Sequence, residues 1–326
     1  MINIFLLKKK HTPLADDESE ILENIELNIK SNNLINLNCS LDDADAIIIQ
    51  EKPSFKNFRY KRILKNDSIF KKYADKIFTI NTDDCATGLI KGLYTSIPKN
   101  RFNPDFHSVV PYSSLNNDLI LKKGPKITPN FLASWRGNPK SNKIRNKLIK
   151  LYCNEVAFDI QSTNSWFNHN NEEKQIYKNS LINAKFSLCP AGWAPVTFRI
   201  YESMALGKCP VIIADQFVRP EGPDWESFSI FVPEDKINNL KQTLEQEESS
   251  YVDLGEKAYQ NWEKFFSPSN ICNYYTTQLI NLIQASKLSS VESEFKRWDS
   301  YDMSFNNNWT IPQRFLNKVK RSISFF

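Results

Sequence analysis

The segment KFSLCPAGWAPVTFRIYESMALGKCPVIIA, residues 185–214, determines the architecture of the second half of the chain. It begins with the apolar run Phe186–Cys189 and ends with a second one, Pro210–Ala214, and such runs are typical of strands buried on both faces. Between them, a Pro-Gly loop leads into a helix predicted over Pro195–Leu206, which Gly207 ends. This order predicts a β-α-β unit of a parallel sheet, whose ligands bind beyond the carboxyl ends of the strands and against helix N-termini.

The predicted helix carries two opposite charges near its start. Arg199 and Glu202 are three residues apart, so their side chains are neighbours, and both fall on the arc opposite the apolar face. A guanidinium in that place can hold a diphosphate through two hydrogen bonds, with the helix dipole adding to the attraction. A carboxylate one turn on can accept hydrogen bonds from a ribose diol. The alternative is an ordinary surface pair worth a few tenths of a kcal/mol.

Ordered motifs surround this pair. They are Tyr177 and Leu181 with AKFSLCPAG at 184–192, then TFRIYES at 197–203 with GKCPVI at 207–212, then DWESFSI at 224–230. The pattern resembles the exostosin family of glycosyltransferases (family 47), and the best resemblance covers Phe131–Pro233. Three departures are mild: Thr197 replaces the family's serine, Ser203 replaces an alanine, and Lys208 is an intrusion before Cys209.

The resemblance implies a fold and an activity. The expected fold class is α/β of the GT-B type, with two Rossmann-like domains that face each other across a cleft and the nucleotide-sugar held by the C-terminal one. The expected reaction moves a sugar from a nucleotide-sugar, most often a UDP-sugar, to a glycan or lipid-linked acceptor, with inversion and without a metal. No cofactor is expected, because the nucleotide-sugar is a substrate. The donor-binding residues implied in this segment are Pro190, Gly192, Thr197, Arg199 and Glu202.

A second segment extends the resemblance toward the N-terminus. The apolar strand Phe131–Trp135 is followed by Arg136-Gly137 and by a helix expected over Asn142–Tyr152. The family has a strand, F-x-G and a helix with I-R-x-x-L at the corresponding place, which adds Arg136, Gly137 and Arg145 as donor-binding candidates. Without the family, Gly137 fits either a close backbone approach to a ligand or a simple turn.

The first half of the chain offers a candidate base. Residues 74–83, ADKIFTINTD, resemble the family's A-D-x-F-F-V-x-x-H-D, which places Asp83 at the carboxyl end of a strand. The family's histidine is Thr82 here, so no imidazole role is carried over. In an inverting transfer a carboxylate can take the acceptor's proton, and Asp83 or Asp84 is the candidate. Either residue fits equally well as the N-cap of a helix expected near Ala86.

Several other residues have weaker claims. Glu221 and Asp224 are alternatives for contacting the sugar, whereas Trp225 and Phe228 are expected in the core. Asp43-Ala44-Asp45 has the spacing of a metal-binding D-x-D motif, but it precedes an apolar run instead of following a strand, which predicts a turn or a helix end.

Three parts are predicted along the chain. Residues 1–125 form a first α/β domain, with strands at 2–7, 46–49, 76–80 and 108–111 and a helix over 17–31; Lys123-Gly124-Pro125 is a plausible hinge. Residues 126–285 form the donor-binding domain. Residues 286–326 carry too many aromatic side chains for a free tail, so they are expected to pack back on a domain.

Composition agrees with a two-domain globular enzyme. The chain has 326 residues, 41% hydrophobic and 24% charged, and a scattered net charge of +5 that suits anionic ligands or a membrane face better than nucleic acid. The six cysteines are dispersed without a C-x-x-C pair, which indicates free thiols in a reducing compartment. Zinc is not expected, because the three histidines lack ligand spacing.

The ends of the chain bear on location. The apolar run before Lys8-Lys9-Lys10 is too short for a signal peptide or an anchor, which predicts a cytoplasmic enzyme. The basic, aromatic-tipped end at 318–326 fits a peripheral contact with an anionic membrane or a plain solvated terminus. The oligomeric state is not predicted. Two rival functions stay open: a fucosyltransferase-like enzyme that uses a GDP-sugar, and a non-catalytic relative that binds glycan.

Overall fold

A computed structural model of the chain describes residues 2–16, 20–30, 35–52, 56–84, 86–121, 127–164, 170–286 and 289–323. These residues form two compact units. The first comprises Met1–Val110 together with Tyr275–Phe326, and the second comprises Pro111–Tyr274. The boundary between the units therefore falls after residue 110, not after residue 125 as predicted. Residues 275–285, predicted in the second domain, belong to the first unit. The predicted hinge Lys123-Gly124-Pro125 lies outside the described residues.

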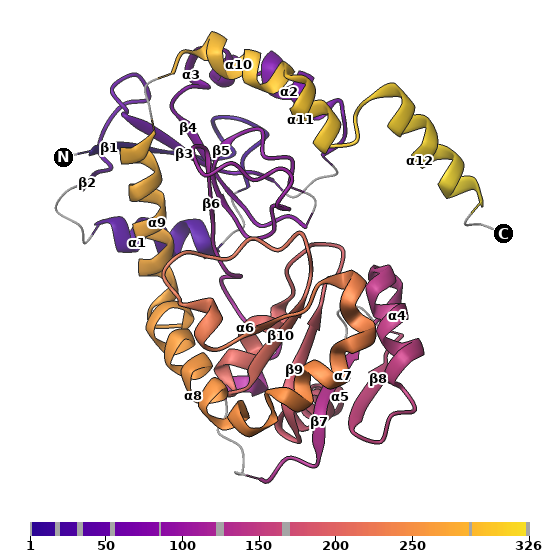
Figure 1. The fold of residues 1–326 in the computed structure, drawn as a ribbon. Coiled ribbons are helices and arrows are strands. Elements are labelled where there is room, and N and C mark those ends of the chain that lie inside the picture. The colour runs from indigo at the N-terminus through magenta and orange to yellow at the C-terminus, as the bar shows by residue number, and fades with distance from the viewer. Residues whose placement is uncertain are drawn as a thin grey trace. The chain divides into compact units, whose positions relative to one another are not determined.

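The first unit is built on a parallel sheet of order β2-β1-β3-β4-β5-β6 (Figure 1). Its strands are β1 (Ile2–Leu7), β2 (Ile35–Asn36), β3 (Ala46–Gln50), β4 (Ile77–Asn81), β5 (Lys91–Tyr94) and β6 (His107–Val109). The four strands predicted from apolar runs are all present, because a parallel strand covered on both faces needs apolar side chains throughout. The sequence did not indicate β2, which is very short, or β5, which contains Lys91 and Gly92.

The helices of this unit come from both ends of the chain. They are α1 (Glu20–Lys30), α2 (Tyr60–Asn66), α3 (Ser68–Tyr73), α10 (Val291–Asp299), α11 (Tyr301–Asn306) and α12 (Ile311–Ile323), while α9 (Ile271–Ala285) begins in the other unit. Trp298 of α10 is buried, and its ring centroid lies 6.2 Å from that of Phe70 on α3. The C-terminal extension therefore packs back on the first unit, as its aromatic content predicts.

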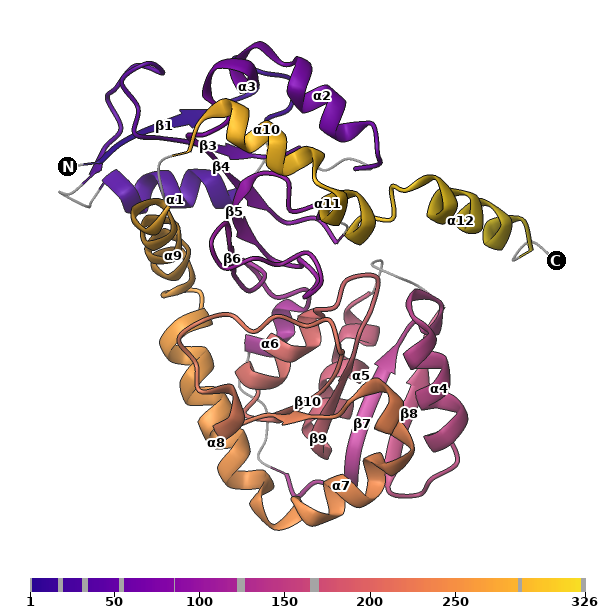
Figure 2. The same ribbon diagram turned by 45° about the horizontal axis from the view of Figure 1, so that its top comes forward.

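The second unit has a parallel sheet of order β11-β10-β9-β7-β8, whose strands lie side by side in Figure 2. Its strands are β7 (Phe131–Gly137), β8 (Phe158–Ser162), β9 (Ala184–Pro190), β10 (Cys209–Ile213) and β11 (Ile230–Phe231). Its helices are α4 (Lys143–Tyr152), α5 (Asn171–Ile182), α6 (Phe198–Ala205), α7 (Leu240–Gln246) and α8 (Tyr251–Asn261). The two units are the two parallel-sheet α/β domains that the GT-B prediction requires.

The β9-α6-β10 segment matches the predicted β-α-β unit, with one correction. Gly207, at a φ of 66°, ends α6 where the sequence places the stop. The predicted polar arc of this helix, however, is not exposed: Arg199, Glu202 and Ser203 are all buried. The reason is that α6 is covered by more than the sheet, since it also contacts α8 and the short 3₁₀ helix Asp118–Leu121, and Tyr112 stacks on Phe198.

Candidate functional site

The predicted donor-binding residues of the second unit gather at one edge of its sheet. Gly137 and Pro190 are the last residues of β7 and β9, which pair in parallel, so both lie at the carboxyl edge. Thr197 follows as the N-cap of α6, and its hydroxyl accepts a hydrogen bond from the backbone N–H of Arg199 at 3.4 Å. This edge, together with the first turn of α6, is where open parallel sheets bind ligands.

Arg199 is the best candidate for an anion contact. Its guanidinium lies 4.9 Å from the ring centroid of Tyr177 and 5.8 Å from that of Trp135, and the residue is 9% exposed. Nη2 donates to the backbone carbonyl of Arg136, whereas the buried Nη1 has no hydrogen-bond partner among the described residues. An unpaired buried donor costs about 1–3 kcal/mol, more when charged. Nη1 is therefore a buried charged donor for which the described part of the chain supplies no acceptor.

Glu202 differs from its prediction. The sequence predicts it as a ribose contact on the arc opposite the apolar face, but the residue is 3% exposed and both carboxylate oxygens already accept hydrogen bonds. Oε1 accepts from the backbone N–H of Asn117 at 3.1 Å, and Oε2 accepts from the Tyr177 hydroxyl at 2.6 Å. Burial raises the pKa of this carboxyl, while Tyr177 and Arg199 oppose the rise. A ribose hydroxyl would therefore meet a carboxylate that is buried and already hydrogen-bonded at both oxygens.

Arg145 shapes the loop between β9 and α6. It donates to three backbone carbonyls, those of Ala191 at 3.0 Å, Asn138 at 3.2 Å and Pro190 at 3.4 Å. Burial, and after it the charge of Arg199, lowers the pKa of Arg145 to about 10. Its predicted contact with a donor stays a prediction, but the structure gives it a clear positioning role.

Two glycines at this edge lie close to other side chains of the site. A Cβ at Gly192 would lie 2.9 Å from Nη2 of Arg145, and a Cβ at Gly137 would lie 3.1 Å from the Trp135 ring and 3.5 Å from Nη2 of Arg199. Gly137 ends β7 and is not a turn residue, and the tight contact that a side chain there would make is with the Trp135 ring. Arg136 itself is half-buried, and its Nη1 donates to Gln161 at 2.6 Å.

The guanidiniums at this edge lie close to one another. The charge of Arg199 acts on Arg145 and on the carboxylate of Glu202, and the Trp135 ring lies within 6 Å of both cations. Neighbouring guanidiniums attract anions, and a low local dielectric strengthens the attraction. Trp135 and Asn117 were not predicted as site residues. Tyr177 was noticed only as part of a motif.

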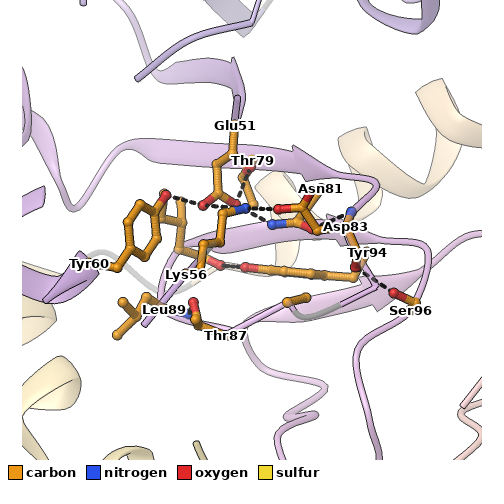
Figure 3. A network of polar contacts seen from close by, with 12 residues as sticks. Glu51, Lys56, Tyr60, Thr79, Asn81, Asp83, Thr87, Leu89, Tyr94 and Ser96 are labelled. Carbon is orange, nitrogen blue, oxygen red and sulfur yellow. Dashed lines mark hydrogen bonds and ion pairs between the residues drawn. The ribbon is translucent and has the colours of Figure 1, made fainter. Parts of the chain in front are cut away.

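In the first unit, Asp83 follows β4 and belongs to a network of buried polar groups (Figure 3). The Nζ of Lys56 lies between two carboxylates, 2.6 Å from Asp83 and 3.2 Å from Glu51. The side chains of Lys56 and Glu51 are 1% and 2% exposed, whereas that of Asp83 is 16% exposed. Asp83 is therefore the solvent-facing end of the triad formed by Glu51, Lys56 and Asp83.

Hydrogen bonds fix the other end of this triad. Glu51 accepts from the hydroxyl of Tyr60, from the Thr79 hydroxyl at 2.9 Å and from the Asn81 amide at 2.6 Å. Asn81 also accepts from the backbone N–H of Asp83 at 3.0 Å. Burial raises the pKa of Asp83, and Lys56 opposes that rise. A carboxyl with a raised pKa at a strand's carboxyl end suits proton abstraction.

The alternative role for this segment is wrong. No helix begins near Ala86: residues 86–89 have no regular structure, and β5 begins at Lys91, so neither Asp83 nor Asp84 is a helix N-cap there. Asp84 is exposed. Glu51 could have been identified from the sequence, because it is a charged residue directly after the buried run of β3. Nothing in the local sequence indicates a role for Lys56.

The weaker candidates divide clearly. Glu221 and Asp224 are exposed, whereas Trp225 and Phe228 are buried in the core as predicted. Asp45 lies in the bend before β3 and accepts from the backbone N–H of Asn3 in β1 at 2.8 Å, so its carboxylate links this bend to the neighbouring strand. Within the described part of the chain, no group of three or more His, Cys, Asp or Glu is placed to hold a metal ion.

No helix among the described residues is long and apolar enough to cross a bilayer. The compartment stays a prediction.

Similarity to known proteins identifies the family. The family model of the exostosin GT47 domain matches residues 70–246. The chain is 39% identical over 83 residues to probable glucuronosyltransferase GUT1 of Oryza sativa subsp. japonica, an alignment that covers 25% of this chain and 20% of that protein. It is 36% identical over 83 residues to probable beta-1,4-xylosyltransferase IRX10 of Arabidopsis thaliana, with the same coverage. The aligned region thus spans only about a fifth of these relatives.

Among solved structures, HepE of Anabaena in complex with UDP aligns with 87% of this chain and 100% of its own, at 10% identity and a TM-score of 0.38. A superposition this loose says nothing about the ligand of this chain. The family model covers more than half of the residues, and it includes the edge of the sheet where Gly137, Pro190 and Arg199 meet. The chain belongs to the exostosin GT47 family.

Proposed function

We propose that the protein is a glycosyltransferase that moves a sugar from a nucleotide-sugar to an acceptor. Family membership supports the reaction class. The observation that carries the proposal is the unpaired Nη1 of Arg199, a buried charged donor at the first turn of α6. A phosphate oxygen supplies the acceptor that this donor lacks, and the N-terminus of α6 adds favourable dipole charge.

The proposed donor is a UDP-sugar. The relatives with aligned regions are named as probable glucuronosyltransferases and a probable xylosyltransferase, and a glycan or lipid-linked acceptor fits such activities. The family match favours this reading over a fucosyltransferase-like enzyme that uses a GDP-sugar. Glu202 would bind the ribose after exchanging the bond that its Oε2 accepts from Tyr177.

The departing diphosphate is stabilised, in this proposal, by protein charges without a metal. The Arg199 guanidinium donates to the diphosphate. Arg145 holds the loop carbonyls in place and adds a second positive charge nearby. Fixed charges of this kind act without reorganising during the reaction, which is why they lower the barrier effectively.

Asp83 is the proposed base for an inverting transfer. Its carboxyl is the partly exposed member of the Glu51–Lys56–Asp83 triad, and its pKa is raised by burial. It would take the proton from the acceptor hydroxyl as that oxygen attacks the anomeric carbon.

The test is a panel of UDP-sugars with release of UDP as the readout, alongside calorimetric titration with UDP, GDP and CMP. We expect UDP to bind and at least one UDP-sugar to be consumed. Binding of GDP in preference to UDP would support the fucosyltransferase-like alternative. Binding of none of the three would contradict the proposal and favour a non-catalytic glycan-binding protein.

The base is tested by Asp83→Asn, with Asp84→Asn as the matched control on the exposed neighbour. We expect Asp83→Asn to lose turnover by about 10²-fold or more while it keeps UDP affinity. Full activity in Asp83→Asn together with loss in Asp84→Asn would transfer the role to Asp84.

A further inference from the structure

The last helix of the described chain, α12, has its apolar face exposed. Ile311, Phe315 and Leu316 are 75%, 67% and 55% exposed, and Val319 is exposed as well. At about 100° per residue, these side chains occupy one continuous arc of about 140°. A helix of a globular protein normally buries such an arc against its core, so the exposure requires an explanation.

The polar side of α12 is the side that contacts the protein. Gln313 donates through Nε2 to the backbone carbonyl of Phe305 on α11 at 3.2 Å, and the guanidinium of Arg314 lies 4.4 Å from the ring centroid of Phe58. Both Gln313 and Arg314 are half-buried. The helix is therefore attached to the first unit through its polar residues and presents its apolar residues outward, the reverse of ordinary amphipathic packing.

The charge of the helix points to the occupant of this face. The sequence of α12 contains four basic residues, Arg314, Lys318, Lys320 and Arg321, and no acidic one. Lys318 is exposed beside the apolar arc. An apolar arc flanked by basic residues is the pattern of helices that lie in the plane of a bilayer surface, with the apolar side among the acyl chains and the cations at anionic headgroups.

We propose that the α12 face formed by Ile311, Phe315, Leu316 and Val319 binds the surface of an anionic lipid bilayer. An anionic bilayer accommodates both the apolar arc and the basic residues of α12. A second copy of α12 would instead bring the basic residues of the two helices against one another. The proposal is independent of the proposed enzymatic function, since none of the residues involved lies at the sheet edges described above.

The experiment is co-sedimentation of the full chain with vesicles of phosphatidylcholine alone and of phosphatidylcholine with phosphatidylglycerol at roughly three to one. We expect binding to the anionic vesicles and at least tenfold weaker binding to the neutral ones. Salt at about 1 M, where the Debye length is about 3 Å, should weaken the binding to anionic vesicles. Equal binding to both vesicle types, or binding to neither, would overturn the proposal.

Paired variants distinguish vesicle binding through α12 from nonspecific binding through other exposed apolar side chains. Phe315→Ala with Leu316→Ala should weaken binding by roughly tenfold or more, since two inserting side chains are lost. Leu27→Ala with Val252→Ala, two side chains each 65% exposed on other helices, should leave it unchanged. Lys318→Glu should weaken it by more than about tenfold through charge reversal.

Two outcomes would assign the face differently. A concentration-dependent dimer by light scattering that Phe315→Ala with Leu316→Ala abolishes would assign it to a second copy and overturn the proposal. Vesicle binding that is insensitive to both changes in α12 would also overturn it. Unchanged thermal midpoints show that the variants fold, as expected for exposed positions.

Discussion

At the scale of single residues, the proposed activity depends on the guanidinium of Arg199. Its Nη2 donates to the Arg136 carbonyl, while its Nη1 finds no acceptor in the segments that the structure describes. This division makes the side chain both a structural link between α6 and β7 and a donor available to a ligand. Gly137 lies against the same group of side chains, because a Cβ there would press on the Trp135 ring at 3.1 Å.

Replacing Arg199 by Met should weaken UDP binding by about 2–3 kcal/mol, or roughly 30- to 150-fold, since a charged hydrogen bond to the diphosphate is lost. Calorimetric titration measures the affinity. Arg219→Met is the matched control, because Arg219 is a partly exposed arginine that pairs with Glu226 on the surface. Unchanged UDP affinity in a folded Arg199→Met protein would refute the assignment.

Lys56 should control the pH dependence of turnover through Asp83. The lysine lowers the pKa of Asp83, against burial and Glu51, which raise it. Lys56→Met removes the opposing charge, so the pKa of Asp83 rises and the acid limb of the rate profile moves to higher pH. Lys56→Arg keeps the charge and should leave the limb near its original position. A limb that does not move in Lys56→Met would exclude Asp83 as the titrating base.

At the scale of elements, β5 shows where a backbone contact constrains the sequence. Gly92, at a φ of 150°, lies so close to β4 that a Cβ would be 2.0 Å from the carbonyl oxygen of Thr79. β4 and β5 cannot move far enough apart to remove this overlap without breaking the backbone hydrogen bonds between them. The close pairing of β4 and β5 therefore requires Gly92, the same residue that interrupts the apolar run by which β5 could have been predicted.

Gly92→Ala should lower the free energy of unfolding by several kcal/mol, or prevent folding, because backbone atoms cannot move aside. Gly207→Ala is the comparison: its φ is also positive, at 66°, but the nearest atom to its Cβ is 3.7 Å away, so only the conformational cost of about 1–2 kcal/mol applies. Urea unfolding of both variants measures the difference. A smaller loss for Gly92→Ala than for Gly207→Ala would contradict the account.

The sequence predicted strands better than it predicted the environment of side chains. β1 agrees with its apolar run to the residue, and β3, β4 and β9 agree within one or two positions at each end, because strands buried on both faces leave a direct signal. The sequence did not indicate that the polar arc of α6 is buried, because Tyr112 and Tyr177 cover it from distant parts of the chain. A helical period shows which residues share a face, but not what lies against it.

The same limit applies to the candidate sites. Each donor-site residue sits in a motif, so the resemblance located the edge formed by β7, β9 and α6. The partners of Asp83 come from separate segments, Glu51 after β3 and Lys56 before α2, and no local pattern connects them. Burial, which raises the pKa of Asp83, is a property of the folded unit and has no local sequence signature.

At the scale of the whole molecule, the first unit is discontinuous in sequence. Residues 275–326 return to it, and Trp298 is buried within the same core as Phe70, Ile47 and Leu64. Trp298→Ala should lower the stability of this unit by about 3–5 kcal/mol, the cost of emptying a large buried site. UDP affinity, a property proposed for the second unit, should be retained in conditions where both units are folded.

Tyr301→Ala is the control for this prediction, since Tyr301 lies in the same extension but is 69% exposed. Chemical unfolding followed by circular dichroism measures stability, and titration with UDP measures binding. If Trp298→Ala has no larger effect on stability than Tyr301→Ala, the extension does not support the core as described.

This return of the chain has a consequence for biosynthesis. On the ribosome, the first 110 residues emerge early, but the tryptophan that completes their core is made only near the end, after the continuous unit 111–274 has been translated. Domains fold as units during translation, so the second unit can fold before the first is complete. Residues 1–110 meanwhile keep an exposed apolar surface. Nascent chains stalled before residue 298 should therefore be preferred clients of chaperones and proteases.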